Sequence, residues 1–380
     1  MYKKLLLGSA IAASTLTLQA TELDNLNAKV DALTEELATL KDKKSSSSAM
    51  DKVSIGGYGK MDYTNYQDNT KANKLDIYRA ILYVGYRFTD DIKFFSEIEW
   101  EHGGRESTGG YGVVEQAYLD FKIADATSLK LGHMVVPVGM VNLYHEPTSF
   151  YSVARPEVEK YIIPSTWHEN GAVVHGRINN FDYQVGMFAG FNASKGTEVR
   201  SMRQNGQKSK ADDFAFVARA DYKNNSGINL GASIYSGKAG QGNAALSDVK
   251  TTIAEVHAGY NMHSIHLKAL YAQSKIDNAS AVAIDHNSTA SGKGSGFYVT
   301  AAYDITDKWT PFVQYEKYNR FDETYSNTGV STGAGKDIIN TTIGVNYRPT
   351  KNVVLKAAYL KRDNRGTDDD QIHLGTGYVF

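Results

Sequence analysis

The side chains in this sequence that could do chemistry are mostly charged, and they lie along segments in which polar and apolar residues alternate. Arg79 and Arg87 share the polar face of one such segment, and Arg177 and Arg219 lie in two others. Rings of charge around water set the selectivity of a pore, whereas opposite charges along a wall can simply neutralise one another. Both interpretations stay open for each residue.

The polar face opposite each apolar row is taken as the face that surrounds water. On that face the basic side chains slightly outnumber the acidic ones, which predicts a mild preference for anions. The twelve basic residues assigned to this face, against nine acidic ones, are Lys60, Arg79, Arg87, Lys93, Lys122, Lys130, Arg177, Arg219, Lys268, Arg348, Lys356 and Arg362.

Segment 137–170 carries the densest group of candidate residues. A connection of this length is seldom without a function, and its aromatic residues, such as Tyr144 and Trp167, could hold it against a wall. We expect the segment to fold inward and to narrow an aqueous passage; the alternative is an external loop that contacts another subunit. Its charged residues proposed for the constriction are Arg155, Glu157, Glu159 and Lys160.

Catalytic and metal chemistry have little support in the sequence. Ser and His are both present, but they form no recognisable arrangement of a nucleophile with a base. The 10 His show no HExxH or other ligand spacing, and there is no Cys. We therefore expect a protein that is not an enzyme, with no metal site and no cofactor.

The elements that must position the charged residues are β-strands, because from residue 52 onward the apolar period is two. Ile339, Thr341, Ile343, Val345 and Tyr347 share one face of a typical segment. Aromatic residues begin or end many of these rows, as the girdles of a membrane barrel require. Sixteen strands are predicted, at 53–64, 75–88, 91–101, 114–124, 127–136, 171–178, 181–191, 213–222, 227–236, 252–262, 264–274, 296–304, 307–318, 337–348, 352–362 and 370–380.

The connections between these strands alternate between short and long. The short ones carry turn residues, as at Thr89-Asp90 and Asn179-Asn180. Outer-membrane barrels sort their loops in this way, with short periplasmic turns and long external loops. The pattern predicts an all-β fold, a 16-stranded antiparallel transmembrane β-barrel over residues 52–380, in the outer membrane of a Gram-negative bacterium. The final Tyr378-Val379-Phe380 resembles the C-terminal tag of such proteins.

The first residues differ from the barrel. Residues 1–20 have a basic start, an apolar stretch and a small-residue cleavage site, which predict a signal peptide. In residues 21–44 an a/d heptad seam predicts a short α-helical coiled coil in the periplasm that drives self-association, and the alternative is a helix lying on the barrel or the membrane. Residues 45–51 are a Ser-rich linker. The seam consists of Leu23, Leu26, Val30, Leu33, Leu37 and Leu40.

The overall charge bears on possible partners. A formal net charge of −1 gives the chain no electrostatic attraction for nucleic acid. A basic stretch in the long loop 192–212, including Arg200 and Arg203, could draw anions or lipopolysaccharide phosphates at the barrel mouth, although solvated loop charge is the simpler interpretation. We expect outer-membrane lipid and lipopolysaccharide around the barrel.

Three stretches resemble a known family. Leu129-Lys-Leu-Gly-His-Met-Val-Val-Pro-Val-Gly, the long loop after it, and Glu169-Asn-Gly-Ala-Val-Val-His-Gly are similar to the phosphate-selective porin O and P family, as is the opening Gly56-Gly-Tyr-Gly-Lys. The resemblance implies a trimeric, 16-stranded channel with an inward third loop. The dense Arg and Lys lining of that family's phosphate channels is not present here.

The expected function is therefore that of an outer-membrane porin. It would let small hydrophilic solutes and ions diffuse passively, with a mild preference for anions such as phosphate or organic anions. The alternative is an adhesin or structural tether, motivated by the heptads and the long loops; a barrel enzyme has less support.

Overall fold

The structure is a computed structural model, which describes residues 49–380 apart from 69, 105–106 and 108. The predicted signal peptide and heptad seam, and most of the Ser-rich linker, lie outside the described residues. No helix in the described part has the length and the hydropathy of a membrane-spanning helix.

The described chain forms one β-sheet that closes on itself. Seventeen strands belong to it, but β14 (Ser331–Gly333) is a short piece within a loop, and the other sixteen form a closed antiparallel barrel. The prediction of sixteen strands is confirmed. They are β1 (Val53–Tyr66), β2 (Lys74–Arg87), β3 (Ile92–Glu101), β4 (Tyr111–Ala124), β5 (Thr127–Val135), β6 (His168–Ile178), β7 (Phe181–Ala189), β8 (Phe214–Lys223), β9 (Ile228–Lys238), β10 (Lys250–Met262), β11 (Ile265–Asp277), β12 (Ala290–Tyr303), β13 (Trp309–Tyr325), β15 (Ile338–Thr350), β16 (Val353–Asn364) and β17 (Gln371–Val379).

The alternation of side chains explains why these segments form the wall. In β8, Phe214 and Phe216 are exposed on the outer surface, while Arg219 and Asp221 are buried inside. Successive side chains of a strand point to opposite faces. The outer face can therefore be apolar against lipid while the lumen remains polar.

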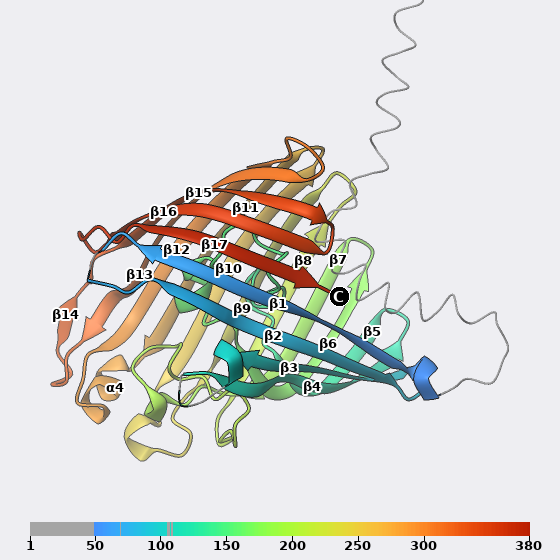
Figure 1. Cartoon of the computed structure of the whole chain (residues 1–380). Coiled ribbons are helices and arrows are strands. Elements are labelled where there is room, and N and C mark those ends of the chain that lie inside the picture. Colours follow the sequence, from blue (N-terminus) through green and yellow to red (C-terminus); the bar gives the residue numbers. More distant parts are fainter. Residues whose placement is uncertain (1–48, 69, 105–106, 108) are drawn as a thin grey trace, which may run out of the picture.

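The ends of the barrel differ as the loop lengths predicted. One end has tight turns, such as the one at Asn179 between β6 and β7, where the backbone takes a left-handed φ of 53°. The long loops, including those with α4 (Ala279–Asp285) and β14, project from the opposite end (Figure 1).

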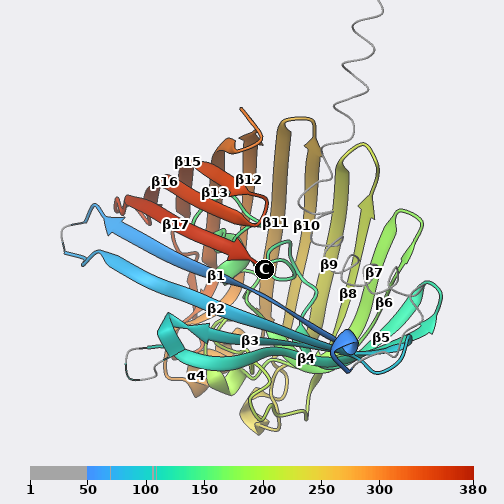
Figure 2. The same ribbon diagram turned by 45° about the vertical axis from the view of Figure 1, so that its right-hand side comes forward.

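The first and last strands meet at a seam that closes the barrel. Tyr58 pairs with Val379, and Gly57 and Phe380 exchange two backbone hydrogen bonds of 3.0 and 2.9 Å. Gly59 leaves room for the ring of Tyr378, since a Cβ at that position would come within 2.3 Å of the ring. In Figure 2, β1 lies between β17 and β2, with the C-terminus beside it.

The loop between β5 and β6, residues 136–167, runs inside the barrel; we call it the inward loop. It contains the short helix α3 (Glu157–Tyr161). Val158, Ile162 and Trp167 are fully buried and belong to an apolar core that also includes wall residues such as Phe188 and Tyr235. Through this core the inward loop packs against the luminal side of the wall from β5 to β13.

Candidate functional site

Basic residues of the wall hold the inward loop by its backbone carbonyl groups. A charged donor forms stronger hydrogen bonds than a neutral one, so these contacts fix the loop at several points along its length. Lys268 donates to Ser149 (2.7 Å), Lys356 to Phe150 (2.5 Å) and Ser152 (3.0 Å), Arg219 to Gly139 (2.6 Å), and Arg348 to Thr148 (3.3 Å).

Helix α3 sorts its charged residues onto two sides. Residues three apart on a helix share a face, so Glu157 and Lys160 turn the same way and Glu159 turns toward the wall. Glu159 is fully buried and accepts hydrogen bonds from the Val141 backbone (2.9 Å) and the Tyr298 hydroxyl (2.8 Å). The expectation that Glu159 lines a passage is wrong in this structure, because the helical phase makes it an internal anchor.

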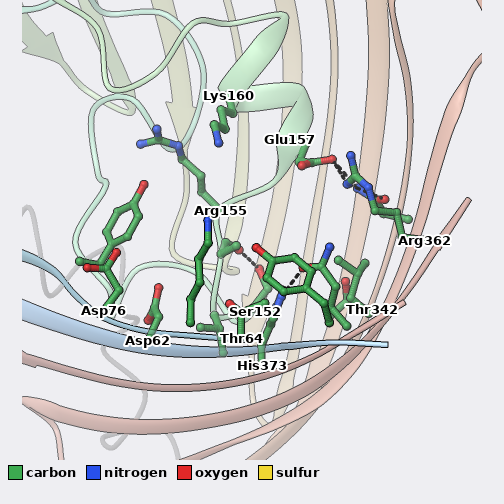
Figure 3. A pocket seen from close by; sticks show the side chains of 18 of the residues that line it. Asp62, Thr64, Asp76, Ser152, Arg155, Glu157, Lys160, Thr342, Arg362 and His373 are labelled. Atoms are coloured by element: carbon green, nitrogen blue, oxygen red, sulfur yellow. Dashed lines mark hydrogen bonds and ion pairs between the residues drawn. The ribbon is translucent and has the colours of Figure 1, made fainter. Parts of the chain in front are cut away.

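A cavity of about 780 Å³ remains on the side of the lumen that the inward loop does not fill. Strands β1, β2, β13, β15, β16 and β17 form its outer side, and the loop segment around α3 forms its inner side. Figure 3 shows Arg155, Lys160 and Glu157 extending from the loop toward this space. Its basic lining residues are Lys60, Lys71, Lys74, Arg79, Arg155, Lys160 and Arg362, and its acidic ones are Asp62, Asp76, Glu157, Glu316 and Asp369.

Most basic residues of the wall around this cavity already have acidic partners. Lys60 pairs with Asp62 at 2.5 Å, and Arg362 pairs with Glu157 across the cavity (Figure 3). Arg79, only 3% exposed, is bound to two carboxylates of the neighbouring strand β3 at 2.8 and 2.9 Å. These pairs add little net charge to the cavity.

Arg155 and Lys160 are different, because neither has a carboxylate partner among the described residues. The Nε of Arg155 is buried without a hydrogen-bond partner, and Lys160 lies over the Tyr161 ring at 5.1 Å. The surplus positive charge of the cavity is therefore carried largely by the inward loop.

A second pair of arginines strengthens the positive charge behind this segment. Arg200 and Arg203, from the loop after β7, donate to backbone carbonyls of the inward loop at Lys160 (2.9 Å) and Pro164 (2.8 Å). Burial, and then the charges of Arg203 and Arg155, lower the pKa of Arg200 to about 9. Burial and Arg155 lower the pKa of Arg203 to about 10. The two residues join loops; the sequence did not predict this role.

The other predicted residues are dispersed along the lumen, away from the cavity. Arg219 is buried at the base of the inward loop, where it pairs with Asp221 at 2.6 Å. Lys130 lies over the Tyr118 ring at 4.8 Å. Four of the predicted basic residues lie toward the short-turn end of the barrel: Lys122, paired with Asp125; Arg177, paired with Asp182; Arg87, at the end of β2; and Arg348, which holds the loop at Thr148.

Irregular pairing between β1 and β2 brings in a residue that sequence alternation placed outside. The register shifts between Lys60 and Asp62, so that β2 contains one extra residue opposite them. Both Tyr78 and Arg79 then line the cavity, although alternation predicted opposite faces. A bulge of this kind leaves no mark in the apolar period.

Comparison with known proteins agrees with this architecture. A family model described as phosphate-selective porin O and P matches residues 54–374. An uncharacterized protein of Aquifex aeolicus (strain VF5) is 33% identical over 346 residues, which cover 84% of this chain and 78% of that protein.

Solved structures share the fold at low identity. The outer membrane channel DcaP of Acinetobacter baumannii is 15% identical with a TM-score of 0.59, covering 86% of this chain and 97% of that one. The anion-selective porin from Comamonas acidovorans is 14% identical with a TM-score of 0.56, and the trimer form of OmpT from Vibrio cholerae is 15% identical with a TM-score of 0.58. Each of these two alignments covers 86% of this chain and 99% of the other.

Proposed function

Since this chain belongs to the phosphate-selective porin O and P family and is an outer-membrane porin, we propose that it passes small hydrophilic solutes with a mild preference for anions. The observation that carries the preference is the position of Arg155 and Lys160 beside the cavity without acidic partners. Charges that face a confined aqueous space act with less screening than charges on an open surface. Phosphate and small organic anions are the solutes that fit this field.

The preference should be modest, because the wall around the cavity is close to neutral. Arg79, Arg362 and Lys60 each have carboxylate partners within ion-pair distance. A channel with strong anion selectivity would need more cations without partners. The proposed constriction therefore consists of the inward loop, with Glu157 and Arg362 as a bridge between the loop and the wall.

We also propose a homotrimer in which the N-terminal heptad segment, residues 21–44, lies in the periplasm and contributes to assembly. The support is the a/d spacing of the sequence and the trimer form of the structurally similar OmpT. Outer-membrane lipid and lipopolysaccharide would surround the outer face of the barrel.

The experiment that tests the function is recording from purified protein in planar lipid bilayers under a KCl gradient. Stable conductance steps, in groups of three, with a reversal potential on the anion side are expected. A cation-side potential would contradict the proposed preference, and the absence of steps would favour an adhesin or tether.

An enzyme has less support. The letters Gly329-Val-Ser-Thr-Gly333 match the G-x-S-x-G spacing, but Ser331 lies in the exposed strand piece β14 and not at a strand-to-helix turn.

A further inference from the structure

Three buried side chains come together where the inward loop meets the wall. The Nε2 of His145 lies 3.3 Å from Glu97 Oε1 and 3.2 Å from Glu115 Oε2. The three side chains, which we call the Glu97–Glu115–His145 cluster, are at most 7% exposed. They come from three segments of the chain, β3, β4 and the inward loop.

A β-bulge brings the two carboxylates to the same side of the wall. Glu97 pairs with Gln116 and Ile98 pairs with Val114, so Glu115 is the extra residue of β4. Bulges often redirect a side chain next to a functional site. Here the bulge directs Glu115 into the lumen, beside Glu97.

The hydrogen bonds of His145 indicate which of its nitrogens faces the carboxylates. Its Nδ1 lies 3.0 Å from the carbonyl oxygen of Asn142, and a carbonyl only accepts, so Nδ1 carries the proton. In the neutral ring, the lone pair of Nε2 then points between two carboxylates. Histidines that bind metals typically donate their other N–H to a carbonyl or carboxylate in this way.

The surroundings of the two carboxylates also fit a metal site. Gln116 donates from Nε2 to Glu97 Oε2 at 2.6 Å, which orients that side chain. Glu115 Oε1 is buried with no N–H donor, and the Glu115 side chain lies beside the carboxyl of Glu99. A buried carboxylate oxygen without a donor is costly unless a cation is near.

The net negative charge of the cluster also favours a bound cation. Arg79, the basic residue beside the cluster, is bound to Glu99 and Glu101, and the half-buried Glu146 next to His145 adds a carboxylate whose Oε2 is buried. A divalent cation would neutralise the two carboxylates of the cluster and leave His145 neutral. A single proton on His145 would leave the cluster with one negative charge.

We propose that the Glu97–Glu115–His145 cluster binds a zinc-type divalent cation, which clips the inward loop to the barrel wall. Tetrahedral zinc with bonds of about 2.0–2.2 Å separates its ligand atoms by roughly 3.3–3.5 Å, close to the distances from Nε2. One nitrogen and two oxygens suit zinc better than calcium or magnesium, which prefer oxygen alone. His145 also lines the cavity, so a fourth ligand, water, could come from that side.

A second histidine on the wall provides a matched contrast. His257 lies between two carboxylates, with Nδ1 2.9 Å from Glu255 and Nε2 2.9 Å from Asp221. Both nitrogens therefore face acceptors, and Arg219 supplies a second positive charge beside them. The positive charges of a doubly protonated His257 and of Arg219 balance the negative charges of Glu255 and Asp221. We therefore expect this group not to bind a metal.

The test is zinc titration by calorimetry of purified, chelator-treated full-length protein. One zinc per chain is expected; Glu115→Gln should weaken binding by more than the roughly 10–100-fold typical of changes around metal ligands, and His257→Gln should leave it unchanged. Each variant is first checked for wild-type conductance, and His145→Gln replaces Glu115→Gln if the latter does not form channels.

Two outcomes would overturn the proposal. One is a wild-type protein that conducts normally but binds no zinc. The other is binding that survives the cluster variant and is lost in His133→Gln, since His133 and His168 face each other at 2.6 Å and form the competing site.

Discussion

Replacing the two loop cations that lack acidic partners should make the channel less anion-selective. We expect the variant Arg155→Ala with Lys160→Ala to shift the reversal potential toward cations, with conductance equal to or larger than that of the wild type. The two side chains line the cavity, and no carboxylate among the described residues forms an ion pair with either of them.

The size of the effect follows from Coulomb's law with screening. An anion about 6 Å from one unit charge gains about 0.7–1.4 kcal/mol at an effective dielectric constant between about 80 and 40. For two charges, screened over a Debye length of about 10 Å at 0.1 M salt, roughly 0.8–1.5 kcal/mol remains across that range. The concentration of anions in the cavity should therefore fall by roughly fourfold to tenfold, which lowers the anion-to-cation permeability ratio.

The assay is the reversal potential across a planar bilayer at 0.1 M mean KCl, where the Debye length is about 10 Å, repeated at 1 M, where it is about 3 Å and the difference should shrink. The matched control is Lys195→Ala with Lys351→Ala, which removes the same charge from two exposed positions. A loop variant that keeps the wild-type reversal potential at low salt would refute the reasoning, because the inward loop would then not set selectivity.

Three further predictions concern the loop, its bridge to the wall, and assembly. Glu159→Ala should lower the free energy of unfolding by about 2–4 kcal/mol, since it leaves buried donors without an acceptor; denaturant titration measures this, and an unchanged midpoint would show that the anchor is dispensable. Burial would raise the pKa of Glu157, but Arg362 holds it below its usual 4.5, so this pair stabilises the protein above pH 4.5 and stops doing so as the pH falls through the lowered value. The cavity then gains positive charge, so anion selectivity should rise as the pH is lowered from above 4.5 through the pKa of Glu157; a reversal potential that does not change while Glu157 becomes protonated would contradict this. Leu33→Asp should weaken the trimer without closing the pore, and equal stability of full-length and barrel-only (52–380) trimers in ultracentrifugation would remove the heptads from the explanation.

The barrel itself could be predicted from the sequence because its cause is local. Alternation along a strand, as in Ile339 to Tyr347, follows directly from a wall with lipid on one face and water on the other. The sorting of short and long connections fixed which end each loop occupies. The inward position of the loop after β5 was expected from its length and from the family resemblance.

The side-chain contacts of the site were harder to predict from the sequence, because they depend on the helical phase of α3 and on contacts between segments far apart in the chain. A step of one residue within α3 separates Lys160, at the cavity, from the anchor Glu159, and a short helix has no period long enough to read. The bulges at Tyr78 and Glu115 change a face without changing composition. The contacts of Arg200 and Arg203 join loops that are far apart along the chain, and no sequence spacing indicates them.

The seam between β1 and β17 has a consequence for the order of assembly. Its pairing joins the first barrel strand to the last, over positions from Tyr58 with Val379 to Tyr66 with Gln371, so it is the most non-local contact in the barrel and cannot form before β17 has reached the membrane. Until then, two strand edges carry backbone groups that hydrocarbon cannot satisfy, at several kcal/mol for each unsatisfied group. Insertion into the bilayer and closure of the ring are therefore coupled, and an open intermediate would have to keep its edges in water or pair them with another protein.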